Sequence, residues 1–381
     1  MTSPIVAVIG GGQLARMMTP AATALGITLR ILVESDEASA AAAAHETVVG
    51  LPTDPDAVQR VLASPRPDVV TWEHEHIPAE VFEACEAAGV PARPGLGALR
   101  FAQDKIEMRR RMDQLGLPNP AWREVATLAD IEEFLAAHGG EAVLKTARGG
   151  YDGKGVRVIS DAADARDWIE SAADGGPRLL VEQKVPFVRE LAVQIARRPS
   201  GDARAWPVVE SIQRDGVCSE VTAPAPGLDP TLARQAEGIA RTIAAELDVT
   251  GALAVELFET AEGLVINELA MRPHNSGHWT IDGSVTSQFE QHLRAVLDLP
   301  LGDTSATAPW TVMANVLGGA RTDLPSALAE TADPGAKVHL YGKGVRPGRK
   351  VGHVTVSGDE AESTYARAVA AAAIVRDGGA A

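Results

Sequence analysis

Two glutamates, Glu256 and Glu268, stand on either side of a short turn in GALAVELFETAEGLVINELA (251–270). The apolar runs and the glycine predict an antiparallel hairpin closed by the three-residue loop 261–263. If residues 260 and 264 close that loop, the two carboxylates face each other directly. Like charges so placed destabilise a strand pair, whereas a cation between them, Mg²⁺ or Mn²⁺, suits oxygen ligands. The hairpin predicts a metal site. A two-residue loop would separate the carboxylates onto opposite faces, and two solvated glutamates are the alternative.

A glycine-rich loop lies near the start of the chain, in VAVIGGGQLARMM (6–18). Gly10, Gly12 and Ala15 satisfy the G-x-G-x-x-G/A pattern of dinucleotide-binding proteins. Glu34 ends the next apolar run, where an NAD enzyme holds a ribose hydroxyl. The pattern predicts a tight turn and a helix N-terminus that offers N–H groups to an anion. By itself it leaves open whether that anion is the pyrophosphate of NAD or another phosphate.

A second glycine-rich segment lies in AVLKTARGGYDGKGVRVIS (142–160), where strand-like runs flank four glycines among residues 149–155. A flexible hairpin tip is one interpretation. A Walker A loop is excluded because no Ser or Thr follows Lys154. The loop can also fold over phosphates, with Lys145 adding a positive charge. Further along, the backbone of 182–185 can bind an adenine edge and Glu190 a ribose hydroxyl.

Two groups of histidines need an interpretation. The sequence TWEHEHIP holds four adjacent candidates for a zinc site: Glu73, His74, Glu75 and His76. Zinc is disfavoured because such sites normally need a third nearby ligand and outer partners. His274 and His278 are four positions apart, but the intervening NSG interrupts a regular helix face. An anion site is therefore favoured there.

A basic cluster lies toward the C-terminal end of the sequence. Its members are Lys343, Arg346, Arg349 and Lys350. A solvated loop and a nucleic-acid patch are two interpretations, and the net charge of −16 disfavours the second. Capture of an anionic substrate group is a third interpretation, and it explains why positive charge is concentrated at this point of an acidic chain.

The composition is that of a globular protein with several domains. At 381 residues the chain is too long for one ordinary core. Its 45% hydrophobic and 23% charged residues are typical of soluble proteins. No segment offers about 18 uncharged apolar residues, and the first apolar run ends in glycines, unlike a signal peptide. Cys85 and Cys218 are far apart, so we expect a reduced, cytoplasmic setting and no nucleic-acid or membrane partner.

The elements that position these residues can be predicted in outline. Strand and helix patterns alternate over the first hundred residues, which predicts a parallel sheet with helices on both faces. Ligands of such sheets lie at the carboxyl ends of the strands, where the glycine loop and TWEHEHIP are found. The Pro- and Gly-rich stretch 91–97 predicts a boundary. One helix is expected from about Leu99 to Gly116.

Several motifs occur together and in order: GGGQLARMM, TWEHEHIP, KTARGGYDGKG, VEQKVPFVRELAV, NELAMRPHNSGHWT and YGKGVRPGRKVGH. In this combination the chain resembles the 5-(carboxyamino)imidazole ribonucleotide synthases, ATP-grasp enzymes of purine biosynthesis. The resemblance runs from about Ile5 to about Val356. It implies an α/β (α+β overall) ATP-grasp fold with three parts. These are a Rossmann-like parallel-sheet domain at 1–98, an ATP-grasp domain at 99–303 with a lid at about 120–180, and a small β-rich domain at 304–381.

The resemblance also implies the reaction. The family couples ATP, bicarbonate and aminoimidazole ribonucleotide to form 5-carboxyamino-imidazole ribonucleotide, ADP and phosphate through carboxyphosphate. It implies a homodimer as well. Another ATP-grasp ligase, such as a formate-dependent ribonucleotide transformylase, is the nearest alternative. An NAD-dependent oxidoreductase is a more distant one, and it explains nothing after residue 100.

The resemblance assigns residues to four sets. The matches to ATP contacts are Arg100, Lys145, Gly150, Tyr151, Asp152, Gly153, Lys154, Gly155, Val156, Glu182, Gln183, Lys184, Val185, Glu190, Gln213, Asn267 and Glu268. The ribonucleotide contacts are Gly11, Gly12, Gln13, Leu14, Glu73, Tyr151, Asp152, Lys154, Lys343 and Arg349. The catalytic set is Lys145, Asp152, Lys154, Arg272, His274 and Asn275, and the metal ligands are Glu256 and Glu268.

Some assignments stay open at this point. Gln213 stands where many family members have His, and Met271 stands where Pro is usual. Either Asp152 or Glu73 can orient or deprotonate the reacting amine. We expect the phosphate of the ribonucleotide at the glycine loop, with the N–H groups of Gln13 and Leu14 as donors, and Glu34 as a structural residue.

Overall fold

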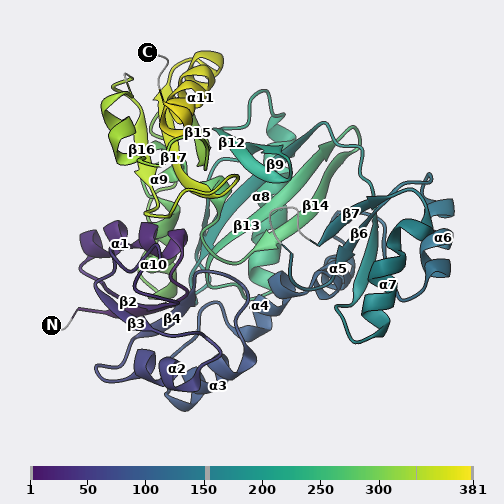
Figure 1. Cartoon of the computed structure of the whole chain (residues 1–381), viewed down its shortest axis with the longest axis horizontal. Helices are drawn as coiled ribbons and strands as arrows, with labels where there is room; N and C mark the ends of the chain where they lie inside the picture. The colour runs from purple at the N-terminus through teal and green to yellow at the C-terminus, as the bar shows by residue number, and fades with distance from the viewer. Residues whose placement is uncertain (1–2, 151–154, 332, 379–381) are drawn as a thin grey trace.

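The computed structural model describes residues 3–150, 155–331 and 333–378. They form three sheets, which Figure 1 shows with their helices. Among the described residues, no helix is long and apolar enough to cross a membrane.

The first sheet is parallel, as the alternating pattern predicts. Its strands, in the order β3-β2-β1-β4, are β3 (Glu46–Val49), β2 (Thr28–Val33), β1 (Ile5–Ile9) and β4 (Val69–Trp72). Its helices are α1 (Gln13–Leu25), α2 (Pro55–Leu62), α3 (Ala79–Ala87) and α10 (Gln288–Val296). Successive side chains of a strand point to opposite faces. Val6 and Val8 therefore share one core with α1 and α10, while Ala7 and Ile9 share another with α2 and α3.

The single helix expected from about Leu99 to Gly116 is wrong, because the chain forms α4 (Leu96–Gln103) and α5 (Lys105–Gln114). Asp104 lies between them in an extended conformation. Its carboxylate accepts the N–H groups of Ile106 and Glu107 and so caps α5. Because an N-cap residue has a non-helical backbone conformation, the first helix ends before Asp104. The pattern of apolar residues continues through this position, so it predicted one helix where there are two.

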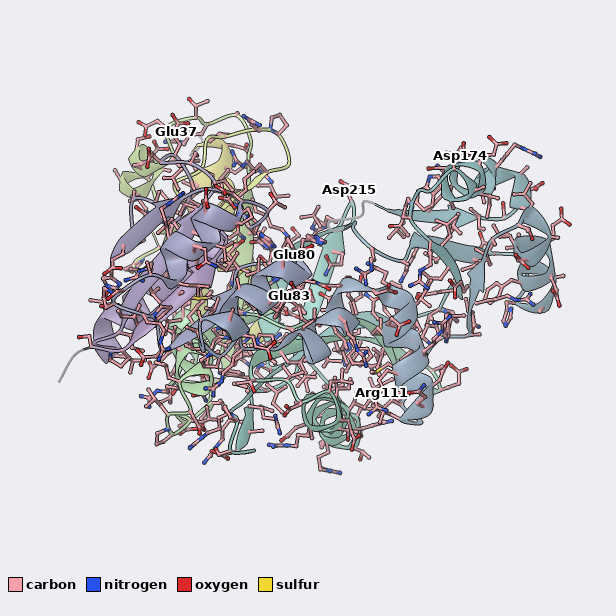
Figure 2. All side chains as sticks on the ribbon, turned by 90° about the horizontal axis from the view of Figure 1, so that it is seen from below. Glu37, Glu80, Glu83, Arg111, Asp174 and Asp215 are labelled. Carbon is pink, nitrogen blue, oxygen red and sulfur yellow. The ribbon has the colours of Figure 1, made fainter. Side chains whose placement is uncertain are left out.

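The second sheet is antiparallel and forms a lobe of its own. Its order is β5-β8-β6-β7, with β5 (Trp122–Val125), β8 (Leu179–Gln183), β6 (Ala142–Thr146) and β7 (Val156–Ile159). Its helices are α6 (Leu128–Ala137), η1 (Ala162–Ala165) and α7 (Arg166–Ala173). The predicted hairpin is present as β6 and β7. Figure 2 shows the lobe, marked by Asp174, standing out from the rest of the molecule.

The third sheet has nine strands and runs into the C-terminal part of the chain. Its order is β14-β13-β9-β11-β12-β15-β17-β16, and β10 pairs with β9. The strands are β9 (Arg189–Arg197), β10 (Ala203–Ala205), β11 (Val209–Arg214), β12 (Val217–Ala223), β13 (Gly251–Thr260), β14 (Gly263–Ala270), β15 (Trp310–Leu317), β16 (Lys337–Leu340) and β17 (Lys350–Gly358). Because β12 pairs with β15, the C-terminal strands extend this sheet rather than forming a separate one.

The two faces of the third sheet differ in chemistry. Leu191, Val193 and Ile195 pack with α8 (Pro230–Glu246), while the alternate residues of β9 face the other way. The segment after β14, with η2 (Asn275–Gly277) and α9 (Thr280–Gly283), contacts β9 and β12. Towards the C-terminus, η3 (Pro325–Ala329) and α11 (Ala361–Asp377) complete the fold. Glu190 of β9, and Glu256 of β13, which pairs with Ala192, therefore lie on the face opposite α8, which we call the polar face.

A buried histidine joins the first and third sheets. His292 Nδ1 accepts the N–H of Ala252 at 3.0 Å, and its Nε2 lies 2.9 Å from Thr71 Oγ1. The ring is thus neutral, with its proton on Nε2, and burial lowers its pKa from 6.5 to about 3. Between these two values the unfolded chain binds a proton that the folded chain does not. The free energy of unfolding therefore falls as pH drops through this window.

We expect His292→Asn to make the free energy of unfolding less dependent on pH below 6.5. Asparagine keeps an acceptor for the Ala252 N–H but does not titrate. The wild-type free energy of unfolding should fall more steeply than that of the variant below pH 6.5, by at most about 1.4 kcal/mol per pH unit. Urea unfolding at several pH values measures both slopes. Equal slopes would show that His292 does not carry this effect.

Candidate active site

In the hairpin of β13 and β14, Glu256 and Glu268 face each other as predicted, but the loop that joins the strands is shorter than predicted. The loop has two residues, because Thr260 pairs with Gly263, and that register alone would separate the glutamates. A bulge at Asn267 then shifts the register of β14, so that Glu256 lies directly opposite Glu268. The three-residue loop is wrong, whereas the facing pair is confirmed. Asn267 Nδ2 donates to Glu256 Oε2 at 3.4 Å, on the same face.

The surroundings of the pair favour a cation. Desolvation, followed by the charges of Glu268 and Glu190, raises the pKa of Glu256 to about 8. Burial raises the pKa of Glu190 to about 7. Lys105 Nζ lies 3.7 Å from Glu268, and His274 Nε2 lies 3.7 Å from Glu256, so both are beyond hydrogen-bond distance. Two facing carboxylates that repel each other fit a divalent cation with oxygen ligands.

No group of three or more His, Cys, Asp or Glu side chains in the described part of the chain is arranged to hold a metal. The Glu256–Glu268 pair thus supplies only part of a coordination shell. The rings of His74 and His76, considered above for zinc, lie 6.1 Å apart.

Lys145 is held by a buried ion cluster. Its Nζ lies 2.7 Å from Glu182, and the guanidinium of Arg109 lies 2.7 Å from the other oxygen of that carboxylate. Burial would raise the pKa of Glu182, but the charges of Arg109 and Lys145 outweigh it and hold the pKa at about 2. Two cations on one carboxylate leave a net positive charge. Arg109 is one of three arginines in a row, and nothing in the local sequence distinguishes it.

The segment after β8 supplies a second set of predicted nucleotide contacts. Gln183 ends β8, and Lys184 pairs with Glu141 at 3.0 Å. Next in the chain, the ring of Phe187 stacks on that of Phe258 at 4.6 Å. Phe258 pairs in register with Glu190. These two aromatic residues were missed, although a flat apolar surface beside Glu190, the predicted ribose contact, suits a purine ring.

Other predicted ATP contacts lie around the same hairpin. Gly150 precedes the gap in the described residues, and Gly155 follows it with a φ of +72°. Val156 begins β7. Four predicted residues lie outside the described part of the chain: Tyr151, Asp152, Gly153 and Lys154. Gln213 is at the register shift of β11, and its Nε2 donates to Ser211 Oγ at 3.0 Å.

Arg272, His274 and Asn275 form a polar corner beside the carboxylate pair. Arg272 Nε bonds Glu75 at 2.7 Å. Burial, then the charges of Arg272 and Lys350, lowers the pKa of His274 to about 3, so the ring is neutral. Both amide atoms of Asn275 are buried and, among the described residues, only the thiol of Cys218 lies near them as a weak partner. Since buried amides normally have partners, this side chain fits a polar ligand that would complete its bonds.

The hydrogen bonds also determine the tautomer of His274. Gln194 Nε2 donates to Ser276 Oγ at 2.7 Å, so the Ser276 hydroxyl is free to donate to His274 Nδ1 at 2.8 Å. The backbone N–H of Ser276 also points at Nδ1. Nδ1 is therefore the acceptor, and Nε2 carries the proton on the side of Glu256.

At the glycine loop, where we predicted the phosphate of the ribonucleotide, two of the N–H groups donate to carboxylates. The N–H of Leu14 donates to Glu73 at 3.2 Å, and that of Gly11 donates to Glu34 at 3.4 Å. A Cβ on Gly12 would meet Glu73 Oε1 at 2.2 Å, so the glycine allows this close approach. The turn thus places Glu73 against the helix start, and phosphate binding at this loop stays a prediction.

The basic cluster divides between two places. Lys343 Nζ lies 2.6 Å from Gln13 Oε1, beside the glycine loop. Arg349 is exposed and donates to the carbonyl of Gly344 at 3.0 Å. Lys350 lies at the start of β17, where its charge acts on Glu256. The cluster thus supplies positive charge both beside the glycine loop, from Lys343, and near Glu256, from Lys350.

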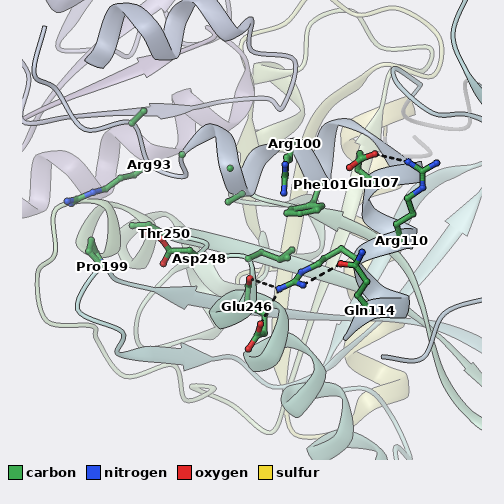
Figure 3. Close-up of a pocket in the computed structure, with 16 residues that line it drawn as sticks. Arg93, Arg100, Phe101, Glu107, Arg110, Gln114, Pro199, Glu246, Asp248 and Thr250 are labelled. Atoms are coloured by element: carbon green, nitrogen blue, oxygen red, sulfur yellow. Dashed lines mark hydrogen bonds and ion pairs between the residues drawn. The ribbon is translucent and has the colours of Figure 1, made fainter. Parts of the chain in front are cut away.

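Arg100 lies on α4, which contacts β14. Its guanidinium covers the ring of Phe101 at 4.6 Å, and it lines a cavity of about 690 Å³. Figure 3 shows this cavity, which Arg93 and Glu246 also line. The residues that line this cavity do not include Glu182, Glu256 or Glu268. The role of Arg100 as an ATP contact stays a prediction. Lys105, overlooked in the sequence, is the cation near Glu268.

Comparison with known families matches nearly the whole chain. Residues 3–103 match the ribonucleotide synthetase preATP-grasp domain, 110–289 the ATP-grasp domain, and 311–367 the phosphoribosylaminoimidazole carboxylase C-terminal domain. The chain is 50% identical over 376 residues to the N5-carboxyaminoimidazole ribonucleotide synthase of Mycobacterium tuberculosis, covering 97% of this chain and 87% of the relative.

Two solved structures are similar over almost their full length. The N5-carboxyaminoimidazole ribonucleotide synthetase of Thermus thermophilus is 38% identical, with a TM-score of 0.86 and coverage of 97% of this chain and 98% of that one. The N5-carboxyaminoimidazole synthase of Aspergillus clavatus, in complex with ADP and 5-aminoimidazole ribonucleotide, is 30% identical, with a TM-score of 0.86 and coverage of 98% and 99%.

Proposed function

The chain belongs to the N5-carboxyaminoimidazole ribonucleotide synthases, and from this premise we propose how its residues perform the reaction. The predicted ATP-grasp fold, with its N-terminal parallel sheet and β-rich C-terminal part, is confirmed. The protein is an ATP-dependent carbon–nitrogen ligase that carboxylates 5-aminoimidazole ribonucleotide in purine biosynthesis. ATP is its co-substrate. We propose the domain boundaries 1–98, 99–303 and 304–381, a homodimer and a cytoplasmic location on the resemblance alone.

The observation that carries the proposal is the facing pair Glu256–Glu268 beside Lys145 and Asn275. Glu256 and Glu268 would hold Mg²⁺ or Mn²⁺, and oxygens of the ATP phosphates would complete the coordination shell. When bound, the metal neutralises charge on the transferred phosphoryl group. Lys145, fixed by Glu182, meets the phosphates from the other sheet. Glu190 and the Phe187–Phe258 stack receive the nucleoside.

Bicarbonate would bind at Arg272, His274 and Asn275. Arg272 supplies charge, neutral His274 donates from Nε2, and the buried amide of Asn275 donates to one oxygen and accepts from the hydroxyl. A bicarbonate oxygen attacks the γ-phosphorus of ATP, the bond to the β–γ bridging oxygen breaks, and ADP leaves. Carboxyphosphate then gives CO₂ and phosphate. The amine nitrogen bonds to CO₂ and loses one proton, which phosphate, Asp152 or Glu73 accepts.

The ribonucleotide would lie between the glycine loop and the basic cluster. Lys343 and Arg349 would bind its phosphate, because positive charge is concentrated there. Glu73 would bind a hydroxyl of the ribose, because a carboxylate accepts hydrogen bonds and a hydroxyl group can donate one. Burial, partly offset by Arg272, raises the pKa of Glu73 to about 7, so near neutral pH it can also take up a proton.

The test of the proposed function is ADP release with single substrates left out. We expect release to require ATP, bicarbonate and aminoimidazole ribonucleotide together, with no stimulation by formate. Formate-dependent turnover would instead indicate a transformylase, and absence of stimulation by the ribonucleotide would contradict the assignment.

The close contact at Gly12 gives a specific prediction for the ribonucleotide. Gly12→Ala places a Cβ against the Glu73 carboxylate while its backbone conformation, φ −78°, suits alanine. We expect the KM for the ribonucleotide to rise about tenfold, equivalent to about 1.4 kcal/mol, with ADP affinity unchanged. Steady-state kinetics and ADP titration measure the two quantities. Gly238→Ala in α8, with open space around the glycine, is the control. An unchanged KM would argue against Glu73 as a substrate contact.

A further inference from the structure

Arg109 is a fully buried arginine on α5 that lies beneath the proposed active site, at 1% exposure. Its Nε and Nη2 donate to the two carboxylate oxygens of Glu182 at 2.7 and 3.1 Å. Its Nη1 also donates to Asn119 Oδ1 at 2.9 Å. The guanidinium is thus oriented by a bidentate pair, a geometry that arginine adopts and lysine cannot.

The remaining bonds of Arg109 go to the bulge of β14. Nη1 donates to the carbonyl of Ile266 and Nη2 to that of Asn267, both at 2.8 Å. These carbonyls directly precede Glu268. β14 is an edge strand, and a bulge leaves backbone groups unpaired in the ladder. Because buried carbonyls need donors, the guanidinium replaces the missing strand partner where the register shifts.

One planar group therefore touches both halves of the site. Through Glu182 it is linked to Lys145, whose Nζ lies 2.7 Å from the same carboxylate. Through the two carbonyls it is linked to Asn267 and Glu268. The lobe that holds Lys145 and the hairpin that holds the carboxylate pair are separate sheets, so their relative placement depends on contacts of this kind.

We propose that Arg109 is a positioning residue that holds the β14 bulge in the register facing Glu256 and, through Glu182, sets Lys145 against it. This inference rests on the proposed function, because the groups it positions are those assigned to the metal and the phosphates. Arg109 itself touches no reactant. Its loss would first affect binding of the metal–nucleotide complex and less that of the ribonucleotide, because Glu73, Lys343 and Arg349 lie outside the lobe and the hairpin that Arg109 joins.

The experiment measures Mn²⁺ binding to the full-length protein in the presence of ADP, by electron paramagnetic resonance. Arg109→Lys keeps a positive charge opposite Glu182 but cannot also reach both carbonyls. We expect its Kd for Mn²⁺ to rise about tenfold, the lower end of the effect of losing a partner that supports metal ligands. Arg109→Met should raise it further. Arg110→Met is the matched control, since Arg110 is the neighbouring exposed arginine and pairs with Glu107 and Glu124.

Two further measurements separate positioning from general stability. The KM for the ribonucleotide of Arg109→Lys should stay close to that of Arg110→Met. Its midpoint of thermal unfolding should fall by a few degrees, because buried carbonyls lose their donor. A Kd for Mn²⁺ within twofold of wild type would overturn the inference, as would an equal loss of metal binding and ribonucleotide binding. If Arg109→Met does not fold, Arg109→Lys still decides. Mn²⁺ binding is measured without turnover, so it tests the role of Arg109 independently of the reaction. The proposed function would fail in a different experiment, if the wild-type protein showed no activity with the ribonucleotide.

Discussion

Replacing Glu268 by glutamine is expected to lower ADP release by about a thousandfold or more at saturating substrates. The change removes one of the two charges that face each other across the β13–β14 hairpin. A metal supplies several kcal/mol of charge stabilisation in such reactions, and each 1.36 kcal/mol of barrier is a factor of ten in rate. Glutamine has nearly the same shape, and the Glu268 side chain is 47% exposed, so the fold should be retained.

The control for this variant lies in the same hairpin. Glu262→Gln changes an exposed glutamate in the turn, where only its backbone N–H makes a described hydrogen bond. It should leave turnover within about twofold of wild type. Mn²⁺ binding with ADP should weaken in Glu268→Gln and not in Glu262→Gln. Near-normal turnover of Glu268→Gln at saturating Mg²⁺ would contradict the metal assignment.

The second large effect is expected for Lys145→Met. Removal of a single fixed donor or charge at a reacting group typically costs about a hundredfold to a thousandfold in rate. The variant also removes one of the two cations on Glu182, but Arg109 remains and keeps that carboxylate paired. We therefore expect a folded protein with weak ADP binding and slow turnover.

Calorimetric titration with ADP and steady-state kinetics measure the two parts of that prediction. Arg123→Met, in the same sheet, removes an exposed cation that pairs with Glu133, and serves as the control. If Lys145→Met binds ADP as tightly as Arg123→Met and turns over at the same rate, Lys145 does not contact the nucleotide.

Local patterns were sufficient for much of the fold. Alternating apolar runs predicted the first parallel sheet because its strands β1, β2 and β4 are buried on both faces. The hairpin of β6 and β7 followed from two strand-like runs around glycines. The helix break at Asp104 was missed because a capping side chain competes with an apolar period that continues through it.

The site was predictable where residue type alone carries the chemistry. Glu256 and Glu268 were paired correctly, yet for an incorrect loop, because the bulge at Asn267 compensates for the shorter turn. A bulge depends on long-range support, in this case from Arg109, and such support leaves no local signal. The same limit applies to Lys105, since only the tertiary fold shows it beside Glu268.

The glycine loop shows which part of a local feature the sequence can predict. Its turn and helix start are present as predicted. Which anion meets the N–H groups is decided by β4, which places Glu73 against Leu14 from 59 positions away. A fingerprint within one segment does not contain that information.

The central claim is that ATP activates bicarbonate and that the activated carbon is transferred to the amine of the ribonucleotide. Isotope transfer from ¹⁸O-labelled bicarbonate tests it most directly, with the phosphate product examined by ³¹P NMR. The mechanism predicts one labelled oxygen in each phosphate released in the presence of the ribonucleotide, because the attacking oxygen stays on phosphorus. Unlabelled phosphate formed together with ADP would contradict it.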